Sequence, residues 1–450
     1  MTRLDEIAAG LQGYDPQAMT TAQVAQFLEQ LVQPVQGRET LPLHETLGRV
    51  LATDLVSPIS VPPHDNSAMD GYAFDGAALQ AGQGLRLRVV GTAFAGAAWS
   101  GVVQAGECLR IMTGAMMPDG LDTVVPQEFT QADGEHIHIP PDLLRPGDNR
   151  RFAGEDLMQG AVALAAGTRL GPAALGLLAS LGLARVQVLR RLRVAYFSTG
   201  DEILSLGEAP REGAVYDSNR FTLLGLLARL GVQAIDLGVV RDEPAALREA
   251  FADAARQADA VITSGGVSVG EADHTRHLMR ELGDVAFWRI AMRPGRPMAV
   301  GRIARHEILA KSASSAYAES ASSSSFNSAS APQDAVLFGL PGNPVAVMVT
   351  FLAFVRPALL RMMGSTEPAP PLLRARSASA IRKKPGRTEY QRGLVARGAD
   401  GQLEVRAAGN QGSGVLSSMV QANGLIVLPH AGGDVAAGDL VDVMVFEGAM

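Results

Sequence analysis

The sequence is poor in cysteine and in aromatic residues. Cys108 is the only cysteine among 450 residues, and Phe, Trp and Tyr together make up 5% of the chain. A single cysteine cannot form an intrachain disulfide, which excludes a disulfide-stabilised secreted scaffold and favours a cytoplasmic location. Because Cys108 lies in the apolar run 107–112, we expect it to be a small buried hydrophobic residue and not a nucleophile.

The sequence also lacks a surplus of positive charge and a long hydrophobic run. Its formal net charge is −7, with a pI near 5.7, so the basic footprint of a nucleic-acid-binding protein is missing. The first residues carry acids and no apolar core, which predicts no secretory signal there. The apolar stretch 345–355 is too short to span a bilayer and predicts a buried helix. We expect neither nucleic acid nor a membrane as partner.

What the chain does contain is enough apolar sequence for several hydrophobic cores. Hydrophobic residues make up 47% and charged residues 19%, which is typical of globular proteins. The length suggests roughly three domains of about 150 residues. In the segment 311–330, ten of the twenty residues are serine. This composition predicts a flexible surface insertion.

Strand and helix patterns alternate from residue 192 onward. Strand candidates occur at 192–197, 234–240, 260–262 and 336–340, with helix candidates at 220–230 and 245–257. This order predicts a doubly wound, parallel α/β domain. Ligands of such sheets bind outside the carboxyl ends of the strands. The unusual segments of this region follow the strands, at 198–202, 241–242, 263–273 and 341–344.

Two other regions consist of short alternating runs separated by turn residues. The first has strand candidates at 85–90, 108–112, 123–128 and 136–139, and the second has them at 403–407, 424–428 and 439–446. We therefore expect a small β-rich domain and, after a linker rich in Pro and Arg from residue 369, a C-terminal β-barrel-like domain. Residues 17–36 and 170–184 predict helices, the second tightly packed, and the prolines of 57–66 predict a loop that presents 67–75.

The segment 263–273 is the most informative part of the chain. It reads Thr-Ser-Gly-Gly-Val-Ser-Val-Gly-Glu-Ala-Asp and directly follows an apolar strand. Small residues allow successive backbone N–H groups to approach a phosphate closely. A plain tight turn uses the same residues, so this loop taken alone leaves both interpretations open.

Carboxylates follow three of the predicted strands. Glu202 follows the first, Asp242 the second, and Asp273 closes the glycine-rich loop. Mg²⁺ prefers oxygen ligands of this kind, with a substrate phosphate completing its shell. For Asp242, which precedes Pro244 and a predicted helix, capping of that helix is an equal alternative.

Cationic and rigid segments accompany these acids. Arg293 and Arg296 lie in a stretch whose Pro and Gly residues fix the backbone, and two guanidinium groups held in this way can receive an oxyanion. A solvated charge pair is the alternative. The segment 338–344, Phe-Gly-Leu-Pro-Gly-Asn-Pro, can be a structural turn or can present backbone N–H groups to an anion.

Other kinds of site find little support in the sequence. His274 and His277 beside Asp273 are too few ligands for a zinc site. The sequence contains no Walker-type Gly-Lys-Ser/Thr loop and no recognisable Ser-His-Asp arrangement. Nucleophilic hydrolysis and ordinary nucleotide-triphosphate hydrolysis are therefore disfavoured.

Eight motifs in order along nearly the whole chain resemble those of the molybdopterin molybdenumtransferases, the MoeA family that includes the gephyrin E domain. None is specific alone, but their order is. The segments are Asp65-Asn-Ser-Ala-Met-Asp-Gly-Tyr-Ala73, Arg110–Ala115, Gly154-Glu-Asp156, Ser198-Thr-Gly-Asp-Glu202, Tyr216–Arg220, Thr263–Asp273, Pro294-Gly-Arg-Pro297 and Gly339–Pro344.

The resemblance implies an enzyme that inserts molybdenum from molybdate into adenylylated molybdopterin and releases AMP with the help of Mg²⁺. Its implied catalytic residues are Asp70, Thr113, Asp156, Glu202, Asp242 and Asp273, of which Glu202, Asp242 and Asp273 would hold the metal. The implied binding residues are Ser198, Thr199, Gly200, Ser264, Gly265, Gly266, Ser268, Arg293, Arg296, Pro341, Gly342, Asn343, Arg387 and Ser413, with Ser268 and the three arginines and Ser413 receiving molybdate.

The resemblance also implies a domain division and an assembly. An elongated linking domain would comprise 1–56 with 143–190, the small β-rich domain 57–142, the α/β molybdopterin-binding domain 191–365 and the C-terminal β-barrel domain 366–450. The family forms homodimers whose site is shared, so the loop 65–73 would complete a partner's pocket. The molybdopterin adenylyltransferase and the enzymes that receive the cofactor are further implied partners.

Two departures from the family pattern qualify the resemblance. Arginine stands at 289, 293 and 296 where the family often has lysine, which replaces a point charge by a fork of donors. The serine-rich segment 311–330 is not part of the pattern. Two alternatives stay open: a molybdopterin adenylyltransferase, against which the loop Ser264–Ser268 and the flanking β domains argue, and a non-catalytic pterin-binding scaffold, against which the intact acids argue.

Overall fold

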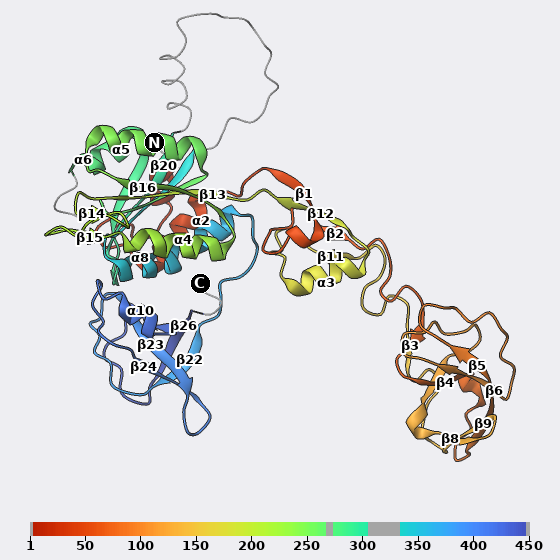
Figure 1. The fold of residues 1–450 in the computed structure, drawn as a ribbon. Coiled ribbons are helices and arrows are strands. Elements are labelled where there is room, and N and C mark those ends of the chain that lie inside the picture. The colour runs from red at the N-terminus through yellow and green to blue at the C-terminus, as the bar shows by residue number, and fades with distance from the viewer. Residues whose placement is uncertain (1–2, 267–272, 305–333, 447–450) are drawn as a thin grey trace, which may run out of the picture.

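The fold comprises three six-stranded sheets joined by short two-stranded ones. It comes from a computed structural model that describes residues 3–266, 273–304 and 334–446. Figure 1 shows an elongated molecule: the α/β part lies beside the C-terminal β part, and a narrow segment leads to the small β part at the far end. The predicted multi-domain fold, with one α/β part and separate β parts, is confirmed.

The α/β part is built on a mixed sheet. Its strands, in spatial order, are β16 (Gln233–Val240), β13 (Arg193–Thr199), β17 (Ala260–Ser264), β21 (Ala335–Leu340), β20 (Pro297–Ile303) and β18 (Gly283–Arg289). The first four are parallel, as predicted. The last two run antiparallel to their neighbours, which the sequence did not predict. The carboxyl ends of the parallel strands therefore meet at one edge, where the unusual loops begin.

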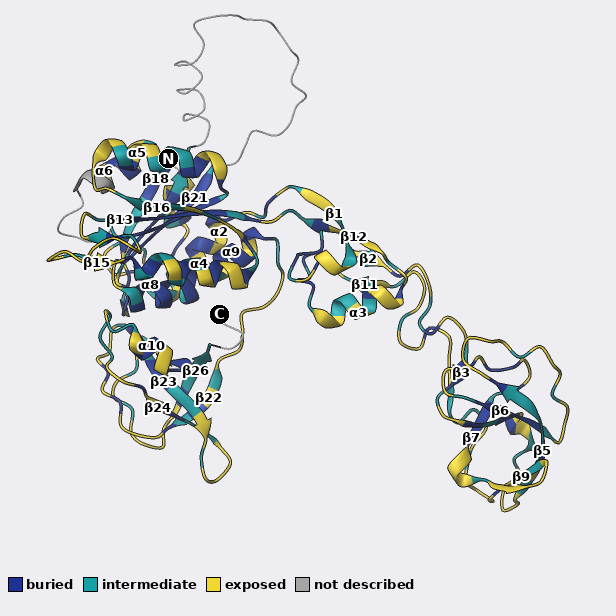
Figure 2. Ribbon diagram, viewed as in Figure 1, coloured by how far each residue is buried: buried dark blue, intermediate teal, exposed yellow. Residues whose placement is uncertain are grey.

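Helices cover both faces of this sheet. Val194 and Tyr196 of β13 pack with α2 (Thr21–Leu31), α4 (Ser218–Leu230) and α8 (Pro344–Thr350). Ala195 and Phe197, which point the other way, pack with α5 (Pro244–Gln257) and α6 (Asp273–Leu282). Figure 2 shows the buried residues concentrated between these layers. The helix predicted within 17–36 begins after Thr20, whose side chain forms a capping box with Gln23.

The apolar helix after β21 is longer than predicted. It runs through α8, a π-helical turn (Phe351–Val355) and α9 (Arg356–Met362). The whole helix, Pro344–Met362, is long and apolar enough to cross a bilayer by length and composition, although the uninterrupted apolar run 345–355 within it is short. The prediction of burial is confirmed, because 78% of the apolar part of this helix lies inside the protein, as expected of a core helix.

The C-terminal part is a closed barrel of five strands. The ring runs through β23 (Thr388–Arg397), β24 (Leu403–Ala407), β22 (Leu373–Ser377), β26 (Leu440–Val445) and β25 (Gly424–Leu428), which pairs again with β23. The short helix α10 is Ser417–Gln421. Strands β22 and β23 lie in the segment expected to begin as a linker. In β23 the usual alternation of apolar and polar residues is absent, because Glu389 and Arg392 are charged and nevertheless buried.

The small β part contains the strands predicted at 85–139. Its order is β7 (Thr123–Pro126), β4 (Gly71–Phe74), β6 (Glu107–Ile111), β5 (Leu85–Ala93), β9 (His136–Ile139) and β8 (Gln131–Asp133). Cys108 is fully buried, as expected, and burial raises the pKa of its thiol to about 12. The segment 67–75, which the proline-rich loop 57–66 was expected to present, supplies the inner strand β4.

The narrow segment between these parts consists of paired short strands. They are β1 (Arg38–Pro42) with β12 (Arg185–Leu189), β2 (Leu55–Val56) with β11 (Val162–Leu164), and β3 (Asn66–Ser67) with β10 (Arg150–Arg151). Its helix α3 (Pro172–Ser180) buries only Leu178, so the tight packing predicted for 170–184 was wrong. The helix packs by one face on a thin layer and leaves the rest partly exposed.

Short elements complete the described chain. They are α1 (Arg3–Ala9), β14 (Ile203–Leu204), β15 (Val215–Tyr216), β19 (Met292–Arg293), and 3-10 turns at Leu43–Glu45, Gly76–Ala78 and Gln127–Phe129. The predicted insertion 311–330 lies outside the described residues.

The contact between Phe27 and Trp288 offers a test of the α/β core. The rings meet edge to face with centroids 4.8 Å apart, and both side chains are almost fully buried. We expect Phe27→Ala to lower the free energy of unfolding by about 3–5 kcal/mol and to shift the Trp288 emission to the red. Urea unfolding followed by fluorescence in a Trp99→Phe background measures both. Phe129→Ala, at a site that is 55% exposed, should change stability by less than about 0.5 kcal/mol.

Candidate active site

A cavity of about 720 Å³ lies at the carboxyl edge of the parallel strands, between the sheet and the barrel. The loops after β13, β17 and β21 form one side, and the segment 292–297 with residues of the barrel forms the other. Thirteen residues predicted from the sequence line it: Thr199, Gly200, Glu202, Asp242, Gly265, Gly266, Arg293, Arg296, Pro341, Gly342, Asn343, Arg387 and Ser413. The strand-edge rule therefore located this cavity.

Glycine is required where the loops after β13 and β17 meet. Gly265 has a φ of +93°, and a Cβ at this position would lie 2.4 Å from the carbonyl oxygen of Thr199. The N–H of Gly265 donates to the carbonyl of Leu340 on the other neighbouring strand, at 3.2 Å. No larger residue fits this crossing without displacing backbone. The two loops consequently approach each other closely, and Gly200, Gly265 and Gly266 add backbone to the lining of the cavity.

The hydroxyl of Thr199 has no partner within the described residues. Thr199 is 4% exposed, lines the cavity, and its Oγ1 makes no hydrogen bond there. A buried hydroxyl without a partner costs free energy that a polar ligand can recover. Together with the adjoining glycine backbone, it makes this end of the cavity suited to phosphate oxygens.

The acidic end of the cavity contains Glu202 and Asp242, both exposed. The Glu202 carboxylate lies over Gly200, where a Cβ would be 2.6 Å from its Oε2. The N-cap position of α5 is occupied by Glu243, the residue after Asp242. The N–H of Asp242 lies 3.4 Å from Oδ1 of Asp201, which draws the two acidic loops together.

The described residues contain no group of three or more His, Cys, Asp or Glu side chains able to hold a metal ion. Mg²⁺ typically uses one or two carboxylates, several waters and phosphate oxygens. The pair Glu202 and Asp242, beside backbone suited to a phosphate, fits that pattern of donors. Asp273 begins α6, but its side chain lies outside the described residues, and so does Ser268.

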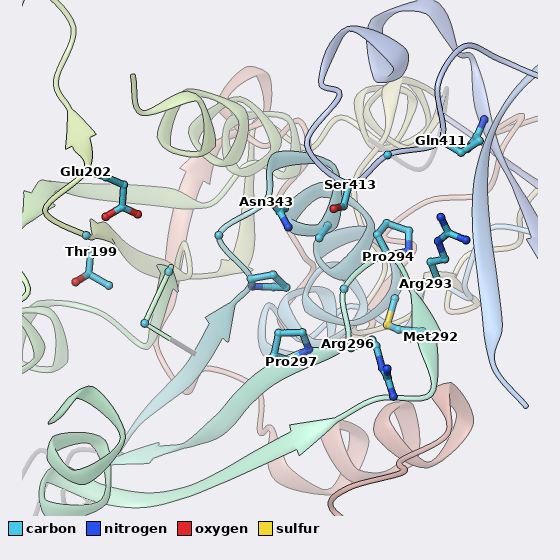
Figure 3. A pocket seen from close by; sticks show the side chains of 18 of the residues that line it. Thr199, Glu202, Met292, Arg293, Pro294, Arg296, Pro297, Asn343, Gln411 and Ser413 are labelled. Atoms are coloured by element: carbon cyan, nitrogen blue, oxygen red, sulfur yellow. The ribbon is translucent and has the colours of Figure 1, made fainter. Parts of the chain in front are cut away.

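Three arginines lie at the other end of the cavity. In Figure 3, Thr199 and Glu202 lie at one end, and Arg293 and Arg296 at the other, with Asn343 and Ser413 between. Arg387 is paired with the buried carboxylate of Glu389, at 2.7 Å. Neither Arg293 nor Arg296 forms an ion pair with a carboxylate of the described chain. Their donors are available to an anion.

A buried arginine that the sequence analysis missed shapes the barrel side. Arg392 is 1% exposed, and its Nη2 donates to the carbonyls of Asn410 and Gly412 at 2.8 and 3.0 Å. Burial, and then the charge of Arg293, lowers the pKa of Arg392. The turn held in this way carries Gln411 and Gly412, which line the cavity beside Ser413 and were also missed. Further lining residues not predicted are Met292, Pro294, Gly295, Pro297 and Ala346.

The sequence offered a signal for some of these residues. Pro294, Gly295 and Pro297 belong to the same rigid segment as the two predicted arginines. Gln411 and Gly412 stand directly before Ser413, in a turn between predicted strands. The sequence offered no signal for Arg392, because its neighbours do not indicate that a charged strand residue is buried.

Two predicted serines lie beneath the cavity. Ser198 and Ser264 are 1% and 3% exposed and do not line it. Their hydroxyls instead bond to the hydroxyl of Tyr196, each at 2.7 Å. They support the loops that follow them and do not face the cavity.

Three predicted catalytic residues lie away from this cavity. Asp70 accepts hydrogen bonds from the N–H and Oγ1 of Thr113, at 2.7 and 2.6 Å, in the small β part. The hydroxyl of Thr113, followed by its N–H, lowers the pKa of Asp70. Asp156 is exposed, and its N–H donates to the carbonyl of Val61. None of the three lines the cavity that contains Glu202 and Asp242.

Comparison with known proteins identifies the family. The model of the MoeA N-terminal region (domain I and II) matches residues 19–182, that of the probable molybdopterin binding domain 195–361, and that of the MoeA C-terminal region (domain IV) 374–446. The chain belongs to the MoeA family. The resemblance stated from the sequence motifs is thereby confirmed.

Similar proteins cover nearly the whole chain. A molybdopterin molybdenumtransferase of Haemophilus influenzae is 40% identical over 423 residues, covering 94% of this chain and 97% of its own length. One of a Nostoc species is 35% identical, covering 96% and 94%. A molybdopterin biosynthesis MoeA protein of Pyrococcus horikoshii has a solved structure with a TM-score of 0.77 and 25% identity, covering 96% of this chain and 100% of that one.

The crossing at Gly265 gives a test of the loop geometry. We expect Gly265→Ala to weaken the affinity for AMP by at least about tenfold, because the added Cβ displaces the Thr199 carbonyl or forces a strained backbone. Calorimetric titration measures the affinity. Gly225→Ala, in an exposed turn of α4 with open space around it, should keep the affinity and raise stability by about 0.5–1 kcal/mol. Equal AMP affinities in Gly265→Ala and Gly225→Ala would contradict the prediction that ligand binding depends on the loop crossing at Gly265.

Proposed function

We propose that this protein inserts molybdenum from molybdate into adenylylated molybdopterin, releasing AMP and forming molybdenum cofactor. One observation carries the proposal: the same cavity contains two kinds of binding group. Carboxylates and glycine-loop backbone able to bind a phosphate lie at one end, and arginines without a carboxylate partner among the described residues lie at the other. Such a cavity suits a reaction that needs an adenylate and an oxyanion bound side by side. The names of the relatives support the same reaction.

The adenylate phosphate would bind at the glycine loops. Thr199, Gly200, Gly265 and Gly266 offer backbone groups and one unpartnered hydroxyl there. The adjoining loop 341–343 begins α8, and the side chain of Asn343 makes no capping hydrogen bond of its own. Its polar atoms are therefore available to the ligand.

Glu202 and Asp242, with Asp273, would hold Mg²⁺ against this phosphate. Bound there, the ion would offset negative charge on the phosphate oxygens as the adenylate linkage breaks. The residues of the chain serve to hold the phosphate still and to keep the carboxylates beside it. Glu202 is suited to this because its carboxylate already lies over Gly200.

Arg293, Arg296 and Ser413, together with Arg387, would bind molybdate. Arginine forks suit a tetrahedral oxyanion, since each can donate two parallel hydrogen bonds. Ser268, which lies outside the described residues, would add a hydroxyl. Arg387 contributes less charge than the others because Glu389 balances it.

We further propose a homodimer in which Asp70, Thr113 and Asp156 of one subunit complete the cavity of the other. In support, none of the three lines the cavity of its own subunit, and Asp70 is exposed just before β4 of the small β part, which lies at the far end of an elongated molecule (Figure 1). Further proposed partners are the adenylyltransferase that supplies the substrate and the enzymes that receive the cofactor. A cytoplasmic location is part of the same proposal and rests on the single cysteine.

The two alternatives have less support. A scaffold without activity needs no acids beside the glycine loops, yet Glu202 and Asp242 line the cavity there. An adenylyltransferase needs neither the barrel nor the arginines, yet both contribute to the cavity. The names of the relatives favour neither.

Release of AMP from adenylylated molybdopterin by the purified protein tests the function. With Mg²⁺ we expect molybdate to stimulate release, and Glu202→Gln to lower kcat roughly 100-fold because a charged group beside the reacting phosphate is lost. Glu249→Gln, on an exposed position of α5, should leave kcat unchanged. No release by the folded wild-type protein under any of these conditions would reject the proposal in favour of the scaffold.

Mixed dimers test the shared site. Asp70→Asn and Glu202→Gln should each abolish most of the activity alone. After the two are unfolded or exchanged together in equal amounts, we expect about a quarter of the wild-type activity, because half the dimers are mixed and each mixed dimer has one intact site. If both acids served a site within one subunit, mixing would restore nothing.

A further inference from the structure

Four buried polar side chains form a connected group directly beneath the glycine loops. They are Tyr196, Ser198, Asp217 and Ser264, and none is more than 3% exposed. None of them lines the cavity. The group therefore needs an explanation other than contact with a ligand.

The four side chains are joined by short hydrogen bonds. The Tyr196 hydroxyl lies 2.7 Å from Oγ of Ser198 and 2.7 Å from Oγ of Ser264. The Ser198 hydroxyl donates to Oδ2 of Asp217 at 2.5 Å. The other carboxylate oxygen, Oδ1, accepts from the N–H of Arg220 at 3.0 Å and caps α4.

The direction of these hydrogen bonds is fixed by the carboxylate at one end. The Ser198 hydroxyl donates to Oδ2 of Asp217, so its single proton points to that carboxylate. The Ser198 oxygen must then accept from Tyr196, and the Tyr196 oxygen from Ser264. The hydroxyls of Tyr196 and Ser198 therefore each donate one hydrogen bond and accept one, and Ser264 is the donor at the start of the chain. Hydrogen bonds linked in this way strengthen one another in a low dielectric.

The chain joins the three elements that frame the phosphate end of the cavity. Ser198 and Ser264 face each other across β13 and β17, one residue before Thr199 and Gly265 respectively. Asp217 stands at the start of α4. In α4, Nδ2 of Asn219 donates to the carbonyl of Gly342, at 2.7 Å, in the third loop. One buried network thus reaches all the loops of the sheet side.

We propose that Tyr196 is a positioning residue, whose hydroxyl holds the Thr199–Gly200 and Gly265–Gly266 loops at the spacing that receives the adenylate phosphate. The ligand named here rests on the proposed function, while the ordering of the loops does not. Without the hydroxyl, Ser198 loses its donor and Ser264 its acceptor, both in a site that water does not reach. The aromatic ring itself packs in the core and would remain.

Tyr196→Phe removes only this hydroxyl, and Tyr390→Phe is the matched control. Tyr390 is also buried, and its hydroxyl makes no hydrogen bond within the described residues. In Tyr196→Phe we expect amide hydrogen exchange of the segments 199–204 and 260–266 to become faster by about threefold to tenfold. Affinity for AMP should weaken by a similar factor. Tyr390→Phe should change neither.

A second variant separates positioning from general destabilisation. Ser264→Ala should reproduce the local change in exchange, and the double variant with Tyr196→Phe should be no worse than the poorer single variant, because both cut one chain. It also provides the test if Tyr196→Phe does not fold. Unchanged exchange at both loops, or a uniform increase throughout the α/β part with unchanged AMP affinity, would overturn the proposal.

The same experiment distinguishes this proposal from the proposed function. Faster loop exchange and weaker AMP binding in Tyr196→Phe, with no AMP release from adenylylated molybdopterin even by the wild type, would support positioning and reject the reaction. AMP release that is equal in wild type and Tyr196→Phe, with equal exchange, would support the reaction and reject positioning.

Discussion

The close approach of Gly265 to the carbonyl of Thr199 is the constraint on which the cavity depends. At this crossing the ends of two parallel strands meet with no room for a side chain, so their loops turn backbone toward the same space. Glu202 follows β13 and Asp242 follows the neighbouring strand β16, so both acids also reach that space. The hydroxyl chain beneath keeps the two loops together where the ladder hydrogen bonds between the strands end.

The barrel forms part of the second side of the cavity, opposite the edge of the sheet. Strand β19 pairs with β23 of the barrel, and the N–H of Val345 at the start of α8 donates to the carbonyl of Ser413, at 3.1 Å. These contacts fix the barrel against the sheet edge, with Arg392 holding the turn that carries Ser413. Opposite charges are thus placed at the two ends of one cavity by different parts of the fold. A ligand with a phosphate and a second anion can occupy both ends together.

Sequence patterns were sufficient to predict a helix or strand where one side of the element is apolar and a turn-forming residue follows its end. The strands at 193–199 and 260–264 and the helices at 218–230 and 244–257 could be predicted for that reason, and so could the loops after them. Patterns failed where buried residues are polar. Glu389 and Arg392 concealed β23. Ser198 and Ser264, which the resemblance placed among the binding residues, are buried, and alternation does not show which face of a strand end is covered. The placement of Asp70, Thr113 and Asp156 follows from the length of the linking segment, which no local motif encodes.

A crystal structure of the protein with AMP and molybdate tests the central claim most directly, since it asks whether one cavity holds both groups. The account predicts the AMP phosphate on the backbone of Thr199–Gly200 and Gly265–Gly266, and the oxyanion between Arg293, Arg296 and Ser413. Density for either ligand elsewhere, such as in the apolar groove between α2 and α9, with this cavity empty, would contradict it.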